Sequence, residues 1–258
     1  MSTTHFGASL DVRFGETVGE FVQFLDERGL SHVEIRQSYL DVHPESPSPE
    51  RLRELADARD VTYTIHSPHK DLNLGNQNER LRRAAVDAVR DSLDFAAAAG
   101  AGAVVVHGGS VRERYPERVR ARAREQAVRS LRECATYADE VEVPLCLENQ
   151  RDKRSKRRNT ATPERLRGLL DDVGVESDYF GLTFDVGHAK VSDVSVDRFV
   201  DEFGDRIRIA HLHDNDGTGD DHEPLPEFRD VAGEVGADYN VLEMKSLADI
   251  DRCVSGRE

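Results

Sequence analysis

One stretch decides the fold, residues 61–108, and it reads VTYTIHSPHKDLNLGNQNERLRRAAVDAVRDSLDFAAAAGAGAVVVHG. Two short apolar runs, 61–67 and 103–108, have the length and β-branched content of buried strands. Between them, over 79–99, small and apolar side chains recur at three- and four-residue steps, at Leu81, Ala85, Ala88, Ser92, Phe95 and Ala99. Gly100 and Gly102 then end the predicted helix. The stretch therefore predicts a strand, a helix packed through that stripe, and a second strand.

The same alternation runs through the whole chain. Eight strands are predicted, at residues 5–11, 32–37, 61–67, 103–108, 143–149, 181–187, 207–214 and 239–244. Thr162 and Pro163 have the residue types of a helix N-cap and a first helical position. No glycine-rich phosphate loop follows the first strand, which argues against a doubly wound open sheet. We therefore predict an α/β protein, a (β/α)8 TIM barrel forming a single domain over residues 1–258.

Composition indicates where such a protein works. The chain has 50 acidic and 35 basic residues, a net charge of −15, and Arg greatly outnumbers Lys. Acidic residues spread along the whole chain are typical of proteins from salt-loving microbes. Cys134, Cys146 and Cys253 show no CxxC spacing, as expected in a reducing cytoplasm. The acidic composition predicts a halophilic protein. Because the sequence has no apolar run of about eighteen residues and no secretory signal, we also expect a cytoplasmic protein with no membrane partner.

Side chains of the kinds that bind metals follow or end six of the predicted strands. They are His66, His107, Glu148, Asp185 with His188, His211 with His213, and Glu243. Because the parallel strands of a barrel all point the same way, these side chains are expected to converge at one mouth, where barrel active sites lie. Imidazole and carboxylate ligands suit zinc, manganese or similar divalent ions, and buried carboxylates need such a counter-charge. The pattern predicts a divalent metal site.

Several motifs together resemble a known superfamily. Residues 66–109, from HSPHKDLNLG to VVVHGG, are followed by CLENQ, FDVGHA, HLHDND and VLEMK, so that the likeness covers nearly the whole chain. In this order they resemble the xylose isomerase-like TIM barrels, which include sugar-phosphate isomerases, epimerases and endonuclease IV. The resemblance to the isomerases and epimerases implies one divalent ion held by Glu148, Asp185, His211 and Glu243. Zn2+ and Mn2+ fit this ligand set, and Mg2+ is an alternative.

The resemblance also implies a reaction. The substrate is expected to be a small-molecule sugar or sugar phosphate, and the reaction an isomerisation or epimerisation through an enediolate. Glu148 and Glu243, on opposite sides of the sugar, remove and return the proton beside the carbonyl. His188 hydrogen-bonds the substrate oxygens, and His66 and His107 also contact the substrate. A homo-oligomer is compatible with the resemblance.

Endonuclease IV is the alternative, with DNA as the partner. Its resemblance implies three zinc ions, and the additional ligands are His66, His107, His188, Asp220 and His222. A trinuclear site of that kind activates a hydroxide for phosphodiester cleavage. Two segments favour the isomerase instead. Residues 34–50 lack the aromatic and basic content of a DNA-binding loop, and TGDDHEPLPE resembles the substrate-side loop of small-molecule members.

A basic segment, RDKRSKRRNT at 151–160, follows Glu148 in this acidic chain. At the mouth of the barrel, its cations Lys153 and Arg154, with Lys156, Arg157 and Arg158, could contact a phosphate. The competing interpretation is a solvated loop that forms salt bridges with the acidic surface. Phosphate binding here fits a sugar phosphate and DNA alike.

Overall fold

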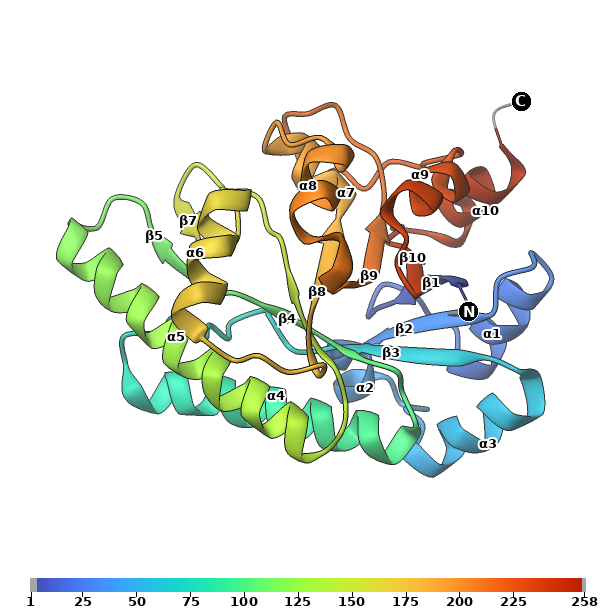
Figure 1. The fold of residues 1–258 in the computed structure, drawn as a ribbon. Coiled ribbons are helices and arrows are strands. Elements are labelled where there is room, and N and C mark those ends of the chain that lie inside the picture. The colour runs from blue at the N-terminus through green and yellow to red at the C-terminus, as the bar shows by residue number, and fades with distance from the viewer. Residues whose placement is uncertain (1–3, 257–258) are drawn as a thin grey trace.

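The computed structural model describes residues 4–256, and its centre is a closed parallel barrel. The order of neighbouring strands is β1-β10-β9-β8-β6-β4-β3-β2, with β2 closing on β1. The eight strands are β1 (His5–Leu10), β2 (His32–Arg36), β3 (Thr62–His66), β4 (Val104–His107), β6 (Leu145–Glu148), β8 (Phe180–Asp185), β9 (Ile207–Leu212) and β10 (Tyr239–Leu242). The predicted (β/α)8 barrel and its strands are confirmed (Figure 1).

Most of the predicted strands run one or two residues beyond the observed ends, and the end of β8 has a specific physical cause. The run 181–187 was expected to be extended to its end, but β8 stops at Asp185 and a short helix, α7 (Val186–Val191), begins at once. The cause is the side chain of Asp185, which accepts a hydrogen bond from the backbone N–H of His188 at 2.7 Å and so caps the helix. A buried aspartate, predicted to be a ligand, therefore also turns the chain.

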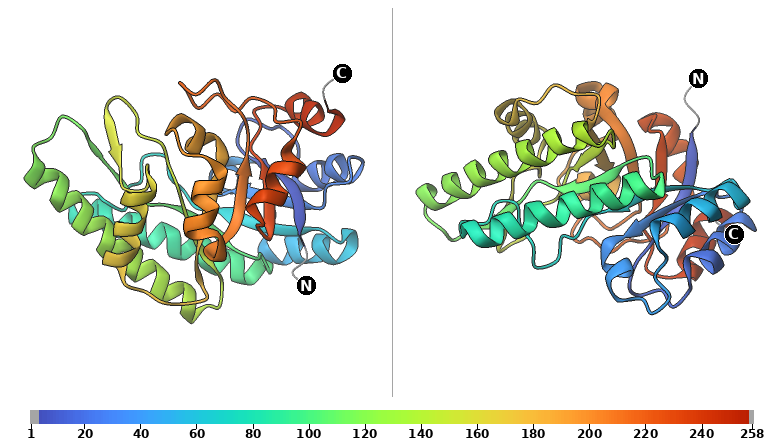
Figure 2. Two further views of the ribbon diagram at one scale, coloured as in Figure 1. Left: turned by 45° about the horizontal axis from the view of Figure 1, so that its top comes forward. Right: turned by 90° about the horizontal axis from the view of Figure 1, so that it is seen from below.

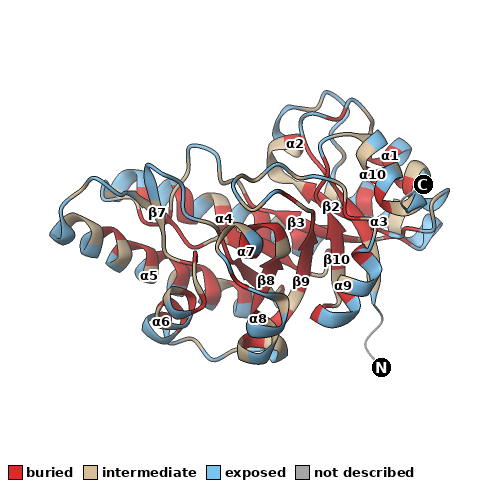
Figure 3. Ribbon diagram, turned by 90° about the horizontal axis from the view of Figure 1, so that it is seen from above, coloured by how far each residue is buried: buried red, intermediate tan, exposed pale blue. Residues whose placement is uncertain are grey.

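Helices cover the outside of the barrel and leave their outer faces exposed (Figures 2 and 3). They are α1 (Val18–Asp26), α2 (Gln37–Val42), α3 (Pro49–Arg59), α4 (Glu79–Ala99), α5 (Glu117–Glu140), α6 (Pro163–Val173), α8 (Val196–Phe203), a 3-10 turn (Gly204–Arg206), α9 (Phe228–Val235) and α10 (Leu247–Ser255). Thr162 caps α6 with Pro163 in its first turn, as predicted. None of the helices in the described part of the chain has the length and apolar character needed to cross a membrane.

The helix α4 has the predicted bounds, with Gly100 in the left-handed conformation at its end. Its buried face is turned from the predicted stripe, since Leu81 is 54% exposed. The buried positions are instead Arg82, Ala85, Val86, Val89, Ser92, Leu93, Ala96 and Ala99. Arg82 takes the place expected of Leu81 because its guanidinium finds partners there, Ser130 on α5 at 3.0 Å and Glu79 at 3.0 Å. The helices α4 and α5 lie side by side (Figure 2).

A small ribbon outside the barrel was not predicted. β5 (Ser110–Arg112), just after β4, pairs antiparallel with β7 (Lys156–Arg158), which comes from the basic segment. The register sets Ser110 opposite Arg158 and Arg112 opposite Lys156. Part of the basic segment is therefore a strand in a fixed register.

Candidate active site at the mouth of the barrel

Four of the predicted ligands come together at the carboxyl ends of the strands. Glu148 ends β6, Asp185 ends β8, His211 lies in β9 and Glu243 follows β10, and all are at most 5% exposed. The Nδ1 atom of His211 lies 3.4 Å from Glu243 Oε1 and 3.9 Å from Asp185 Oδ2. Ligand atoms of Glu148, Asp185 and His211 lie within 4.8 Å of one another. The predicted set therefore converges on one small volume.

Two atoms of this group are buried without a hydrogen-bond partner. They are His211 Nδ1 and Asp185 Oδ2, which lie 3.9 Å apart and have only ion-pair neighbours, Glu243 Oε1 at 3.4 Å from the first and His188 Nδ1 at 3.0 Å from the second. A buried polar atom without a partner is costly, and a divalent ion between these atoms would satisfy both. The donor set of one imidazole and three carboxylates is also the one that zinc and manganese accept. The residues present therefore fit a divalent metal ion.

Glu34, in the middle of β2, was not predicted to belong to the site. It is fully buried, and its Oε2 lies 3.0 Å from Nε2 of His211. A carboxylate on one ring nitrogen holds the proton there and leaves the other nitrogen, Nδ1, free to bind a metal. The sequence signal was a charged residue between Val33 and Ile35.

The pKa values of the buried carboxylates show that the group carries negative charge, which a cation would balance. Burial raises the pKa of Glu148, but contacts with His107, His188 and His66 hold that pKa well below the usual value. Burial likewise raises the pKa of Asp185, and His188 and neighbouring imidazoles bring it well below. The carboxylates are therefore ionised.

The pKa of the His211 imidazole is shifted upwards, whereas the pKa values of the carboxylates are shifted downwards. Burial lowers the pKa of His211, yet Glu243 and Glu34 raise it to about 10. Without a metal, the excess negative charge at the mouth is thus balanced by a proton on this ring. A metal ion would replace that proton, because a ligating imidazole must be neutral at the bound nitrogen.

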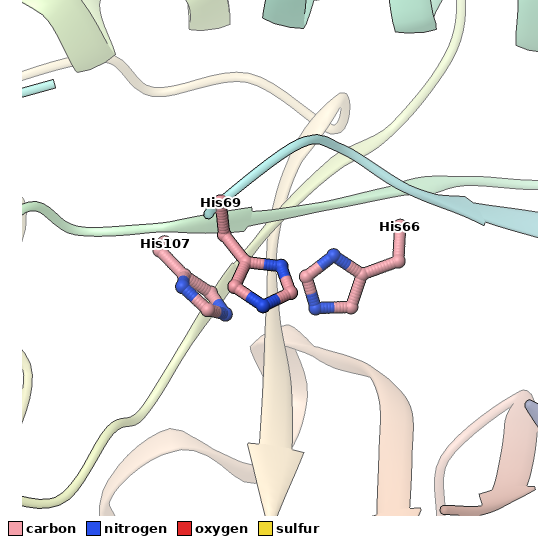
Figure 4. Close-up of side chains that lie close together, drawn as sticks. All are labelled: His66, His69 and His107. Atoms are coloured by element: carbon pink, nitrogen blue, oxygen red, sulfur yellow. The ribbon is translucent and has the colours of Figure 1, made fainter. Parts of the chain in front are cut away.

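Three imidazoles form a second group on the β3 and β4 side of the mouth. His66, His69 and His107 offer ligand atoms within 4.8 Å of one another, and Figure 4 shows their rings side by side. His107 Nε2 lies 3.0 Å and His66 Nε2 3.5 Å from the same oxygen of Glu148, Oε2. His69 was not predicted. Burial, with His66 and His107 nearby, lowers its pKa to about 2, so that the ring is neutral.

The remaining predicted residues form a third group on the opposite side. His188 Nδ1 lies 3.1 Å from Glu148 Oε1, and its Nε2 lies 3.3 Å from Asp220 Oδ2. His222 Nε2 lies 3.5 Å from Asp220 Oδ1. His213 joins them, with ligand atoms of His213, Asp220 and His222 within 4.8 Å. All nine residues of the proposed trinuclear set thus surround one mouth.

Arg36, the last residue of β2, is a second functional candidate that was not predicted. Its guanidinium pairs with Glu243 Oε1 and donates from Nε to Ser9 Oγ at 3.0 Å. Burial raises the pKa of Glu243, but Arg36 and then His211 hold it far below the usual value. Arg36 therefore fixes the position of one oxygen of this carboxylate.

A cavity of about 860 Å3 opens above these groups. Its floor includes His66, His107, Glu148, His188 and Glu243, and one wall is the loop 68–77. The cavity is also lined by cations of the ribbon and of the segment before β7, namely Arg112, Lys153, Lys156 and Arg158. Arg154, predicted to bind phosphate with Lys153, is exposed and does not line the cavity. A cavity of this size accepts a small polar molecule rather than a macromolecule.

Comparisons with known proteins agree with this geometry. Residues 22–245 match the family described as Xylose isomerase-like TIM barrel. MJ1311, an uncharacterized protein of Methanocaldococcus jannaschii, is 32% identical over 179 residues, 68% of this chain and 59% of the length of that relative. MJ1614 of the same organism, also uncharacterized, is 27% identical over 209 residues, 78% of each chain. Among solved structures, a D-tagatose 3-epimerase-like protein superposes with a TM-score of 0.81 at 27% identity, covering 98% of this chain and 95% of the other.

Proposed function

The chain belongs to the xylose isomerase-like TIM barrel family, and from this premise we propose that it is a divalent-metal-dependent isomerase or epimerase of a sugar or sugar phosphate. The observation that carries the proposal is the convergence of Glu148, Asp185, His211 and Glu243, where two buried atoms make no hydrogen bond. The name of the D-tagatose 3-epimerase-like protein, the most informative of the relatives described above, supports a sugar substrate.

The metal has one task in this proposal. When bound by Glu148, Asp185, His211 and Glu243, it supplies positive charge that lowers the cost of the negative charge developing on the substrate oxygens. The ion would be zinc or manganese, with magnesium as an alternative.

Two carboxylates move the proton. Glu148 ends β6 and Glu243 follows β10, and in the barrel the strands β8 and β9 lie between them. The two carboxylates therefore approach a molecule in the cavity from different sides. Inversion at a carbon needs one group to remove the proton from one face and another to return a proton to the opposite face. Because both pKa values are held low, both carboxylates are ionised and either can act as the base.

Imidazoles orient the substrate. His188 is held by Asp185 Oδ2 at 3.0 Å and Glu148 Oε1 at 3.1 Å, so that its ring is fixed at the edge of the cavity. Burial lowers the pKa of His188, but Asp185, Asp220 and Glu148 raise it well above the usual value, which makes the ring a donor to substrate oxygens. His66 and His107 line the other edge and can bind hydroxyl groups.

Exchange of a carbon-bound proton with solvent tests this function. The metal-loaded protein is incubated in D2O with a panel of ketopentoses, ketohexoses and their phosphates, and loss of the C–H signal beside the carbonyl is followed by NMR. The wild type should exchange at least one substrate, and Glu243→Gln should lower the rate about 100-fold or more. Glu140→Gln, at an exposed position on α5, is the control. Exchange that survives in Glu243→Gln contradicts the assigned base.

One observation favours a second candidate, an apurinic-site endonuclease. His66 and His107 contact Glu148, and His188 and His222 contact Asp220, and these are residue types that bind zinc. Elemental analysis of protein purified without chelators separates the two. One tightly held ion per chain supports the isomerase. Near three zinc ions, together with nicking of duplex DNA at an abasic site, supports the endonuclease.

A further inference from the structure

Five cations that line the cavity form no salt bridge in the part of the chain that the structure describes. Two of them are Lys70 and Arg112, and the other three, Lys153, Lys156 and Arg158, belong to the basic segment. Their neighbours behave differently, since Arg151 pairs with Asp220 at 3.6 Å and Arg165 with Asp152 at 2.6 Å. In a chain of net charge −15, carboxylates are plentiful. Cations that face a cavity without a carboxylate partner are therefore available to a ligand.

The strand β7 explains which cations face the cavity. Successive side chains of a strand point to opposite faces, so Lys156 and Arg158 share one face and Arg157 takes the other. Lys156 and Arg158 line the cavity, whereas Arg157 does not and lies 4.0 Å from Glu113. Pairing with β5 thus directs alternate cations of the basic segment inward.

The position of the ribbon is fixed before any ligand binds. Asn73, in the adjoining loop 68–77, accepts from the backbone N–H of Ser110 at 2.9 Å and donates to its carbonyl oxygen at 2.8 Å. The guanidinium of Arg158 donates to the backbone oxygen of Arg151 at 3.0 Å. Preorganised donors bind an anion without a further cost of ordering.

The positive charge of Lys153 and Arg158 is only partly compensated by the nearby carboxylates Glu148, Asp152 and Asp220. Burial lowers the pKa of Lys153, and Arg158 and Arg151 lower it further. Burial also lowers the pKa of Arg158, to which Arg151 adds, although Glu148 acts in the opposite sense. An anion beside these groups would offset both effects.

We propose that Lys153, Lys156 and Arg158 form an anion subsite that binds the phosphate monoester of a sugar whose carbonyl end lies over Glu148 and Glu243. The substrate class is thus a sugar phosphate rather than a free sugar, which rests on the isomerase function proposed above. Both ends lie in one cavity of about 860 Å3, which is lined by the metal-type ligands and by these cations. A phosphate at one end of the sugar would lie against the cations, and the carbonyl at the other end would lie against the metal-type ligands.

Paired ligands test the subsite. Calorimetric titration of the metal-loaded protein compares D-ribulose with D-ribulose 5-phosphate, and inorganic phosphate serves as competitor. The phosphate ester should bind about 10- to 100-fold more tightly than the neutral sugar, because charge-assisted hydrogen bonds add affinity. Inorganic phosphate should compete with the ester. Lys156→Gln combined with Arg158→Gln should remove most of this advantage and change the affinity for D-ribulose by less than about threefold.

Arg154→Gln is the matched control, because Arg154 belongs to the same hairpin but does not line the cavity. It should leave the affinity for the ester unchanged. Circular dichroism and the single substitutions Lys156→Gln and Arg158→Gln separate loss of binding from loss of folding. Equal affinities for ester and neutral sugar would overturn the proposal, as would an equal loss for both ligands in the double variant. Binding of abasic duplex DNA, but not of the ester, through these cations would overturn it as well.

The subsite and the proposed function fail in different ways. If the neutral sugar exchanges its C–H proton while the ester shows no advantage, the subsite is wrong and the isomerase stands. If the ester binds through Lys156 and Arg158 but no substrate exchanges a proton, the anion subsite stands and the reaction is wrong.

Discussion

Gly187, in the first turn of α7, is the position at which the site can be disturbed most selectively. A Cβ atom added there would lie 2.0 Å from Cε1 and 2.4 Å from Nδ1 of His213. That ring is fully enclosed and bonds Asp185 Oδ1 at 3.1 Å, and no real side chain tolerates such a contact. In Gly187→Ala, His213 must therefore move away from Asp185.

The expected cost follows from these contacts. Loss of a hydrogen bond to a charged partner costs about 1.5–3 kcal/mol, and overpacking of a filled interior costs about 1–3 kcal/mol. The gain in helix propensity from Gly to Ala offsets about 1 kcal/mol. The free energy of unfolding should thus fall by about 1.5–5 kcal/mol. Zinc affinity should fall with it, because Asp185 is a proposed ligand and loses the partner that orients it.

Urea denaturation of the chelator-treated protein, at one fixed salt concentration, measures the change without the contribution of metal binding. Gly233→Ala on α9 is the matched control, because nothing lies within 4 Å of its added Cβ. This control should be neutral or more stable by up to about 1 kcal/mol. If Gly187→Ala is no less stable than Gly233→Ala, the packing of His213 against Gly187 is not as described.

Three further predictions concern the metal site. Glu34→Gln should weaken zinc binding about 10- to 100-fold in a chelator competition, because the ring of His211 loses the carboxylate that orients it; Glu140→Gln should bind as the wild type does. The free energy of unfolding of the metal-free protein should fall as pH rises from about 6.5 through about 10. Burial lowers the pKa of His211, but Glu243 and Glu34 raise it to about 10 in the folded state. Stability from a raised pKa is fully present below the pKa of the unfolded state and is lost as pH passes the pKa of the folded state. Melting temperatures at pH 6, 8 and 10 check this, and His211→Gln should flatten the dependence. Removal of the metal by chelator should abolish proton exchange, and zinc or manganese should restore it; exchange that persists without metal contradicts the proposed site.

The fold could be predicted because its signals are local. Each strand is a short apolar run, and each helix begins and ends at residues such as Thr162 and Gly100, whose roles need only near neighbours. The set of ligands at the strand ends could also be predicted, because parallel strands in a barrel share one direction. The stripe on α4 was turned by one position because Arg82 finds charged and polar partners on α5, which the local pattern does not contain.

The partners of the ligands were missed for a different reason. In β2, His32, Glu34 and Arg36 alternate with Val33 and Ile35. The polar residues form the face of the strand that points into the barrel, whereas the apolar content of the run indicates only a buried strand. Only closure of the barrel brings Glu34 against His211, which is 177 positions away in the sequence. The same holds for the basic segment, since its pairing with β5 decides that Lys156 faces the cavity and Arg157 does not.

The two candidate reactions make opposite demands on one carboxylate. Oxygen Oε2 of Glu148 faces His107 and His66, and oxygen Oε1 faces His188. A carboxylate shared by two cations would be a much weaker base towards a carbon-bound proton, because their charge would stabilise its ionised form. With one ion, His107 holds Oε2 by a hydrogen bond, and the carboxylate keeps the capacity to act as a base. The number of ions at this mouth therefore decides the chemistry, because it decides whether Glu148 is a bridge or a base.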